Sequence, residues 1–474
     1  MRRYDQVVRL LQQQIDSGAL KVGERLPSIR ETSAATGYSM VTVQHAYEIL
    51  QGEGLIRSQP RSGFYVAQPS RPLAEFAALT KDEGVGDLSP VAASSLAYKI
   101  PSRWARGGLE PFGSLLPGGD LFPAAEIDLF LRARLRRKHQ ASPAPNDPNA
   151  ILREAVARRL TQRGSLVSPA NVVLTRGALH ALNLCLDVVT RAGDLVLVES
   201  PSFFPLLSLL EQRNLKVLEI YSHPKTGIDP DQFDHLLSHN EVTACVLMPI
   251  SHYPTGVTYQ PDIMARIVAT ARQHKVPIIE NDMYAELSYS GVPPNAMKSL
   301  DSSDNILQFG SFETTLGPGC DVGWVVSGRH REALERRAFF DDRLDGAPRL
   351  IEQALAQYLT RRSYDRQLRH VRETVAARMR RGLALVAEYF PHNCAASRPV
   401  GGAMCWIRGP KEFDALSASR RALHRGIALA PGPIFSVTSS FRNFIGLNLS
   451  VPWTAEREQK LRVIGELLGR PSGP

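Results

Sequence analysis

The chain lacks the features that would place it in a membrane, secreted or metal-dependent class. No apolar run among its 474 residues approaches the roughly 20 needed to cross a bilayer, and its first residues carry no apolar segment of the secretory type. Its five cysteines lie far apart, without a C-x-x-C pair or a histidine at zinc-binding spacing. We therefore expect a cytoplasmic protein with reduced cysteines, no metal site and no membrane partner.

What the chain does contain is an excess of positive charge and enough residues for several domains. Its 56 lysines and arginines outnumber 47 acidic residues, giving a net charge of +9. This balance suggests a polyanionic partner without identifying one. A single hydrophobic core stops growing at roughly 250–300 residues, so the length predicts at least two domains.

Residues 1–67 have the pattern of three short helices followed by a hairpin. Apolar residues at helical spacing fill 4–17, and a second helix begins near Ser28. After a turn at 36–38, Ser39 is placed to cap a third helix. Two helices joined by a glycine-containing turn are typical of a helix-turn-helix, whose second helix enters the DNA major groove. The alternating residues 55–66 predict a two-stranded wing.

This unit resembles the winged helix-turn-helix of the GntR family of bacterial regulators. The resemblance rests on Gly-x-x-Leu-Pro-Ser-x-Arg from residue 23, Ser-x-x-Thr-Val from 39, Glu-Gly-Leu from 53 and Arg-Ser-Gly-x-Tyr-Val from 61. It implies a double-stranded DNA operator as partner. Arg25 and Arg61 would contact phosphates. Met40 departs from the arginine frequent at its position, so base readout there would be apolar or lost. The residues implied to face DNA are Arg25, Ser28, Arg30, Ser39, Thr42, Gln44, His45, Arg61 and Gly63.

Beyond residue 67 the sequence predicts a linker and then an α/β region. Residues 68–110 are rich in Pro, Ala, Ser and Gly, which favours a linker. From 111 onward, buried apolar strands alternate with helices, indicating a mostly parallel sheet. We expect a large α/β part over about 111–345 and a smaller α+β part over about 346–474.

The motifs of this region resemble those of fold-type I aminotransferases, which use pyridoxal phosphate. Residues 310–324 keep the frame of the segment that carries the Schiff-base lysine, and further family motifs follow in order, among them Glu199-x-Pro201 and Pro254-Thr255-Gly256. Together with the winged unit, the architecture resembles the MocR-type branch of GntR regulators. In that branch the aminotransferase-like domain usually binds pyridoxal phosphate and senses an amino compound.

Several residues depart from the family pattern at the positions that serve the cofactor. Thr314 stands in place of the reactive lysine, and a hydroxyl cannot form an imine with an aldehyde. Tyr253 replaces the asparagine that bonds to the ring oxygen, and Asp321 replaces a cation near the phosphate. Gly446 stands where an arginine would clamp the substrate carboxylate, although Arg442 lies nearby. Because all four departures affect groups that serve one cofactor, they indicate a coordinated loss of the cofactor site.

Other positions of the cofactor site survive, so the resemblance implies a retained cavity. Asp282 and Tyr284 match the groups that bind the ring, and Phe203 matches the stacking aromatic. Each also has a structural interpretation, Asp282 as an ion-paired carboxylate and the aromatics as core. Arg176 and His252 are either remodelled pocket residues or surface and supporting polar residues. The predicted effector pocket comprises Gly177, Ala178, Phe203, Tyr253, Asp282, Tyr284, Thr314 and Asp321.

The sequence thus predicts a transcriptional regulator that binds DNA as a homodimer. Its aminotransferase-like domain is expected to be catalytically inactive, to carry no cofactor, and to serve in dimerisation and in sensing an unidentified small molecule. Two alternatives remain open. The domain could bind pyridoxal phosphate non-covalently, or it could be an active aminotransferase with a DNA-binding appendage.

Overall fold

A computed structural model describes most of the chain. The described residues are 3–16, 19–21, 23–52, 55–59, 62–66, 76, 99–104, 108–137, 149–291, 293–342, 350–360 and 363–469. All five cysteines lie within these ranges, and each is buried and free, as predicted. None of the described helices is long and apolar enough to span a membrane.

The N-terminal unit has the predicted three helices and wing. Its elements are α1 (Arg3–Asp16), α2 (Ile29–Thr36), α3 (Met40–Gly52), β1 (Ile56–Gln59) and β2 (Gly63–Val66). The two strands pair antiparallel, with Ile56 opposite Val66. Val7 and Leu11 from α1 pack against Val43 and Leu50 from α3 in a separate small core. The unit therefore has its own hydrophobic interior.

The central feature of the large C-terminal part is an eight-stranded sheet. Its strand order is β3-β10-β9-β8-β7-β4-β5-β6. The inner strands from β9 to β5 run parallel, whereas β10 pairs antiparallel with both neighbours and β6 is an antiparallel edge. This confirms the predicted mostly parallel sheet. The strands are β3 (Val172–Thr175), β4 (Leu195–Ser200), β5 (Lys216–His223), β6 (Gly227–Ile228), β7 (Val242–Leu247), β8 (Ile278–Asn281), β9 (Ile306–Ser311) and β10 (Gly323–Val326).

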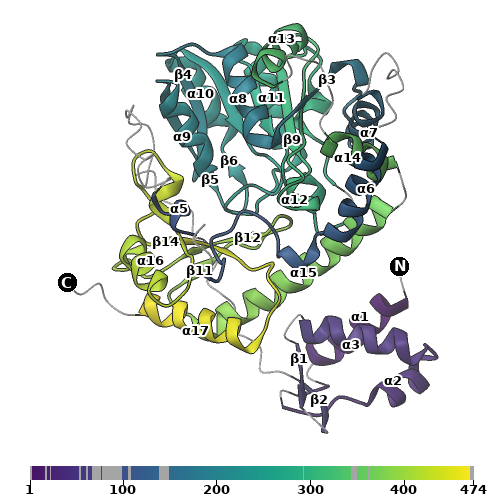
Figure 1. Cartoon of the computed structure of the whole chain (residues 1–474). Helices are drawn as coiled ribbons and strands as arrows, with labels where there is room; N and C mark the ends of the chain where they lie inside the picture. The colour runs from purple at the N-terminus through teal and green to yellow at the C-terminus, as the bar shows by residue number, and fades with distance from the viewer. Residues whose placement is uncertain are drawn as a thin grey trace.

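Helices cover both faces of this sheet, so successive strand residues enter different cores. Val196 and Val198 of β4 join one core, and Leu197 between them joins another. One face is covered by α8, α9 and α13; the other is covered by α7, α10, α11 and α14 (Figure 1). These helices are α7 (Ala150–Thr161), α8 (Gly177–Val189), α9 (Phe204–Gln212), α10 (Pro230–His239), α11 (Pro261–Gln273), α13 (Arg331–Asp342) and α14 (Leu350–Thr360).

The smaller part is a four-stranded antiparallel sheet with flanking helices. Its strand order is β11-β12-β14-β13, with β11 at Ala395–Ala396, β12 at Met404–Arg408, β13 at Ala430–Pro431 and β14 at Phe444–Asn448. The helices α15 (Ser363–Tyr389), α16 (Ala415–Leu423) and α17 (Ala455–Gly469) pack around it. The remaining helices are α5 (Pro101–Trp104), α6 (Ala124–Arg137) and α12 (Glu313–Leu316). Because α14 packs on α6 and α7, it belongs with the large part.

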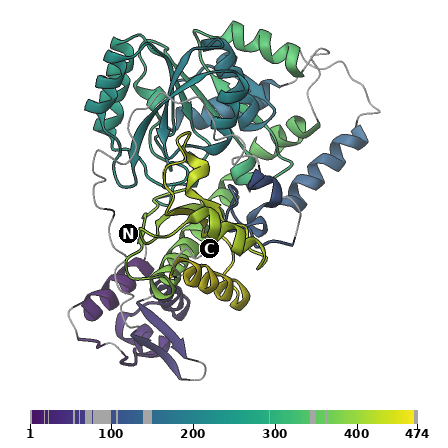
Figure 2. The same cartoon turned by 90° about the vertical axis from the view of Figure 1, so that its left-hand side faces the viewer.

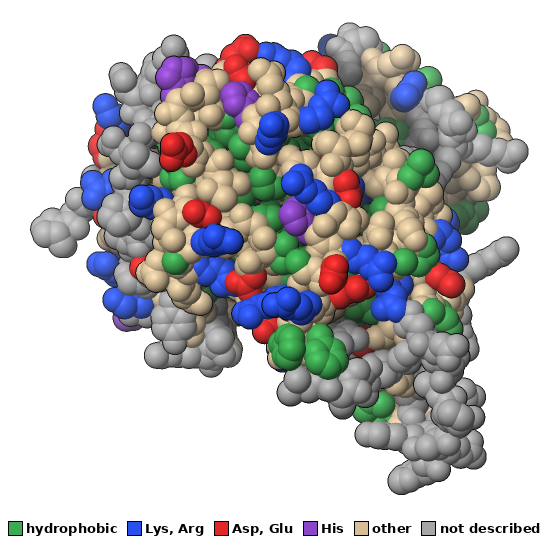
Figure 3. Space-filling model, turned by 90° about the horizontal axis from the view of Figure 1, so that it is seen from above, with side chains coloured by type: hydrophobic (Ala, Val, Ile, Leu, Met, Phe, Trp, Pro, Cys, Tyr) green, Lys and Arg blue, Asp and Glu red, His purple; other side chains and the backbone are tan. Residues whose placement is uncertain are grey.

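The winged unit lies at one end of the molecule, far from the large sheet. Figures 1 and 2 both place it at the lower end of the molecule, next to α15, and α3 contacts this long helix. On the opposite end of the molecule, seen in Figure 3, Lys and Arg side chains lie among Asp and Glu side chains. The net positive charge does not form one continuous basic surface on that face.

Candidate functional site

The start of α2 is built around Ser28 and presents Arg30. The Ser28 hydroxyl accepts from the backbone N–H of Glu31 (3.2 Å), and the Glu31 carboxylate accepts from the backbone N–H of Ser28 (2.6 Å), forming a capping box. These bonds hold the pKa of Glu31 below its usual range. Arg30 lies in the first turn, with its side chain exposed.

The third helix has one buried face and one exposed face. Ser39 accepts at its hydroxyl from the backbone N–H of Thr42 (3.3 Å), as a helix cap does. Tyr47, on the buried face, donates its hydroxyl to the carbonyl of Pro27 (2.6 Å) and so fixes the start of α2 against α3. Gln44 and His45 are exposed. The His45 ring also contacts α1, with its centroid 4.6 Å from that of Tyr4.

The wing brings two of the predicted DNA-facing residues together. Gly63 has φ +106°, a left-handed conformation that favours glycine. A Cβ at this position would lie 3.3 Å from Nε of Arg25, so the Arg25 side chain lies over the wing glycine. Arg61 falls outside the described residues. The structure thus groups Arg25 with Gly63, Ser28 with Arg30, and Ser39 with Thr42, while the DNA contacts themselves remain predictions.

In the aminotransferase-like part, Thr314 is tied to the protein backbone. Its side chain lies in α12, is 1% exposed, and donates its hydroxyl to the carbonyl of Met283 (2.8 Å). The nearest lysine in sequence, Lys298, is bound by Asp301 (3.0 Å between Nζ and Oδ2) and by Asp304. Neither residue offers an uncommitted amine to an aldehyde.

The carboxylate of Asp282 is held by an arginine. Arg163, in the turn after α7, donates from both terminal nitrogens to the two Asp282 oxygens, with 2.7 Å between Nη2 and Oδ1. The side chains are 5% and 2% exposed, so this is a buried bidentate ion pair. Arg163 also donates from Nε to the carbonyl of Pro294 (3.2 Å). The acceptor that would meet a pyridine nitrogen is therefore already occupied.

Aromatic side chains fill the space around Tyr253. Its ring centroid lies 5.9 Å from that of Phe203, 5.6 Å from that of Phe435 and 6.2 Å from that of Tyr284. Tyr253 is 1% exposed, and its hydroxyl has no partner within the described chain. Burial raises its pKa. Tyr284 in turn donates its hydroxyl to the carbonyl of Leu115. All four aromatics thus belong to a packed core.

The N-terminus of α8, where an anion would bind, faces an acidic side chain. Gly177 begins this helix with φ +72°, and Ala178 beside it is buried. A Cβ on Gly177 would lie 2.8 Å from Oε1 of Glu313. Burial and the charge of Asp321 raise the pKa of the Glu313 carboxyl. A carboxyl group of the chain itself therefore occupies the end of the helix dipole that favours phosphate.

The surroundings of Gly446 and of Asp282 are closely packed. Gly446 lies in β14, where a Cβ would come within 2.9 Å of Cε of Met404 and 3.4 Å of Cζ of Phe435. Arg442 is exposed. The cavity beside Thr314 and Asp282 measures about 30 Å³, close to the space of one water molecule. Thr314 and Asp282 line this cavity, whereas Phe203 and Tyr253 do not.

The polar residues next to the site have protein partners. Arg176 donates from Nη2 to the carbonyl of Asp341 (3.1 Å) on the exposed side of α8. His252 is buried, with Nδ1 2.8 Å from the Thr255 hydroxyl and Nε2 3.5 Å from the Glu199 carboxylate. Burial lowers the pKa of His252. Arg176 and His252 therefore act as supporting polar residues that bond to other groups of the protein. Within the described ranges no group of three potential metal ligands occurs.

Two residues that shape the site carry no sequence signal. Arg163 is separated from Asp282 by 119 positions and follows a helix as an ordinary arginine. Glu313 stands inside the family motif, but nothing local shows that it meets Gly177. An arginine that pairs with Asp282 could be expected from the sequence, but nothing in the sequence distinguishes Arg163 from the other arginines.

Comparison with protein families identifies both parts of the chain. Residues 3–66 match the bacterial regulatory proteins of the gntR family, and residues 134–448 match aminotransferase class I and II. The uncharacterised HTH-type transcriptional regulator YdcR of Escherichia coli is 35% identical over 99% of both chains. The HTH-type transcriptional regulator TauR of Rhodobacter capsulatus is 26% identical over 92% of this chain and 90% of its own.

Solved structures share the fold of the C-terminal part. The α-aminoadipate aminotransferase LysN of Thermus thermophilus, complexed with N-(5'-phosphopyridoxyl)-L-leucine, has a TM-score of 0.70 and 24% identity, covering 80% of this chain and 95% of its own. The kynurenine aminotransferase of Pyrococcus horikoshii has a TM-score of 0.71 and 22% identity, covering 79% and 94%. At this identity the likeness concerns the fold.

Proposed function

This chain belongs to the MocR-type HTH transcriptional regulators, which join a gntR-type domain to an aminotransferase class I and II domain, and we propose that it regulates transcription without pyridoxal phosphate. The gntR-type domain binds DNA. The finer proposal concerns the second domain, which we infer to be catalytically inactive and to act as a dimerisation and effector-sensing module.

The observation that carries the proposal is the buried pair between Arg163 and Asp282. In an enzyme of this fold the carboxylate would bind the ring nitrogen, whereas here both oxygens accept hydrogen bonds from the guanidinium. Displacing the arginine would leave a buried charge unpaired, which is strongly unfavourable. In addition, Thr314 stands in place of the lysine whose amine would form the imine, and its hydroxyl donates to the Met283 carbonyl. The two changes oppose the cofactor through independent interactions.

The winged unit supports the DNA part of the proposal. Arg30 and the cap of α3 are exposed at neighbouring helix starts, and Arg25 lies over the wing glycine. A homodimer would present two such units to paired half-sites. Because arginine contacts to phosphates release counterions, we expect binding to DNA from upstream of the protein's own gene to weaken steeply with salt.

A spectroscopic experiment tests the cofactor part of the proposal. The purified protein is incubated with pyridoxal phosphate, desalted and scanned, and its DNA binding is measured with and without the cofactor. We expect no imine band in the near ultraviolet or violet, no heat of binding at millimolar cofactor, and unchanged DNA binding. A band that shifts when an amine is added would establish the active-enzyme alternative. Heat without a band would establish non-covalent binding.

The Thr314→Lys variant provides a sharper form of this test. We expect no imine band from this single change, because the Arg163–Asp282 pair, Tyr253 and Glu313 still oppose the cofactor. The lysine must also enter a buried position, where overpacking lowers stability by about 1–3 kcal/mol. Thr314→Ser, which keeps the hydroxyl, serves as control. An imine band in Thr314→Lys would show that the site still accepts the cofactor.

A further inference from the structure

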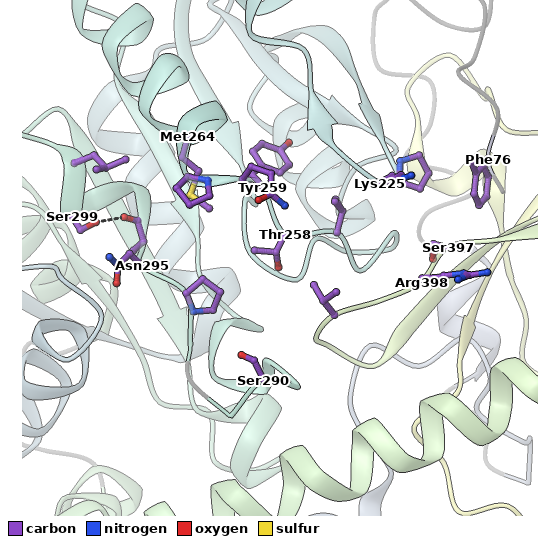
Figure 4. Close-up of a pocket in the computed structure, with 18 of the residues that line it drawn as sticks. Phe76, Lys225, Thr258, Tyr259, Met264, Ser290, Asn295, Ser299, Ser397 and Arg398 are labelled. Carbon is purple, nitrogen blue, oxygen red and sulfur yellow. Dashed lines mark hydrogen bonds between the residues drawn. The ribbon is translucent and has the colours of Figure 1, made fainter. Parts of the chain in front are cut away.

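A second, much larger cavity lies away from the former cofactor site. It is a groove of about 890 Å³ between the large and small parts of the aminotransferase-like domain. One wall comes from the β5–β6 turn, the start of α11 and the loop before β9, and the other from residues 396–400 (Figure 4). Small-molecule sites usually measure about 300–1,000 Å³, so this groove has the size of a ligand site.

The groove combines exposed apolar side chains with positive charge. Leu300 and Val400, which line it, are 44% and 52% exposed although they are large hydrophobic residues. Lys225 and Arg398 are exposed cations in its lining, and Figure 4 shows them at the same end of the groove. Arg398 has no acidic partner among the described residues, and no described lining residue is acidic. This lining fits an anion with an apolar body.

Phe76, a residue of the segment that joins the DNA-binding unit to the rest of the chain, also lines the groove. Its ring stacks on Phe444 of β14, with 6.2 Å between centroids and 18° between planes. The Arg408 guanidinium lies 5.5 Å from the centroid of the same ring. In Figure 4 the ring stands beside Lys225 and above Arg398. A ligand near the two cations would therefore contact a residue of the connecting segment.

We propose that this groove is an effector site for an organic anion with an apolar or aromatic body. The anionic group binds between Lys225 and Arg398, and the body packs against Phe76 and Val400. Contact with Phe76 links the ligand to the segment that leads to β2 of the wing. The binding of the anion stands on the groove alone, whereas its effect on DNA rests on the proposed function.

A fluorescence titration tests the binding site without DNA. The probe is 8-anilinonaphthalene-1-sulfonate, an organic anion with an aromatic body. We expect saturable binding to the full chain and roughly tenfold weaker binding to the Lys225→Ala/Arg398→Ala variant, because charge-assisted hydrogen bonds are lost. The double variant Lys411→Ala/Arg425→Ala removes two exposed cations outside the groove and should bind as the wild type does.

Two results would overturn the assignment. The first is equal affinity of the wild type and the Lys225→Ala/Arg398→Ala variant, with thermal melting showing that both are folded. The second is equally tight binding of N-phenyl-1-naphthylamine, the uncharged analogue, in competition with the sulfonate. Since both cations are exposed, their removal should leave the fold intact.

A second measurement separates coupling from binding. We expect the sulfonate to change the affinity of the wild-type chain for its upstream DNA, and to change it less in Phe76→Ala. Unchanged DNA affinity with saturable fluorescence would refute the coupling and retain the site. Loss of DNA binding in every sample would instead contradict the proposed function, while the titration would still decide the groove.

Discussion

The winged unit and the region around Tyr253, Asp282 and Thr314, here called the cofactor site after its role in the family, both keep a family framework but differ in how their side chains are engaged. In the winged unit Arg25 and Arg30 are exposed, Arg25 over the wing glycine Gly63 and Arg30 after the capping residue Ser28. In the cofactor site the strands, the start of α8 and the turn around 310–324 remain, while protein groups bind to one another inside. The framework is thus kept while buried polar groups such as Asp282 and Thr314 bond to other groups of the chain.

The largest effect on this comparison should come from Arg163→Ala. It leaves the Asp282 carboxylate buried without its partner, and such losses lower the free energy of unfolding by about 3–5 kcal/mol. Thermal and urea unfolding of the aminotransferase-like domain measure the change. Arg266→Ala, which breaks a surface pair with Asp231, should lower it by less than about 1 kcal/mol. If both variants lower the free energy of unfolding equally, the buried pair between Arg163 and Asp282 does not stabilise the domain more than a surface pair does.

In the winged unit, Arg30→Ala should abolish the specific gel mobility shift of DNA from upstream of the protein's own gene. A lost arginine contact weakens binding by about 1–3 kcal/mol, a factor of roughly 5 to 150. Titrations at two salt concentrations measure the loss. Arg9→Ala removes an exposed arginine from α1 and should change affinity little. Normal binding by Arg30→Ala would show that another surface recognises the DNA.

A smaller effect is expected from Tyr253→Phe. The Tyr253 hydroxyl is buried without a partner in the described chain, so its removal should be neutral or raise the free energy of unfolding by about 1 kcal/mol. Tyr259→Phe is the matched control, because the Tyr259 hydroxyl donates to the Glu199 carboxylate. That change should lower stability. If Tyr253→Phe lowers stability as much, its hydroxyl has a bound partner.

The smallest effect should come from Glu313→Gln and should depend on pH. Because the pKa of Glu313 is raised by burial and by Asp321, the folded chain binds its proton more tightly than the unfolded chain. Stability from this group is present at low pH and declines as pH rises through the raised value. Glu313→Gln should therefore be relatively more stable at pH 8 than at pH 5, by at most about 1 kcal/mol. An unchanged difference across this range would contradict the raised pKa.

Local patterns were sufficient to predict most of the fold. Helical spacing and capping residues placed α2 and α3, and the alternation of apolar strands with helices predicted the mostly parallel sheet. The helix α14, which follows the boundary predicted near residue 346, packs on α6 and α7 of the large part. Its helical pattern does not specify the partner on which it packs.

The sequence by itself determined that the reactive lysine is absent, because Thr314 occupies its place in an intact motif. Only the tertiary structure decided what contacts the residues at the family's cofactor positions: Arg163 binds Asp282, aromatic rings surround Tyr253, and Glu313 lies near Gly177 at the start of α8. The physical reason is that motifs encode local backbone geometry, whereas buried pairs form between side chains that chain folding brings together. The groove beside Phe76 likewise exists only where distant segments meet.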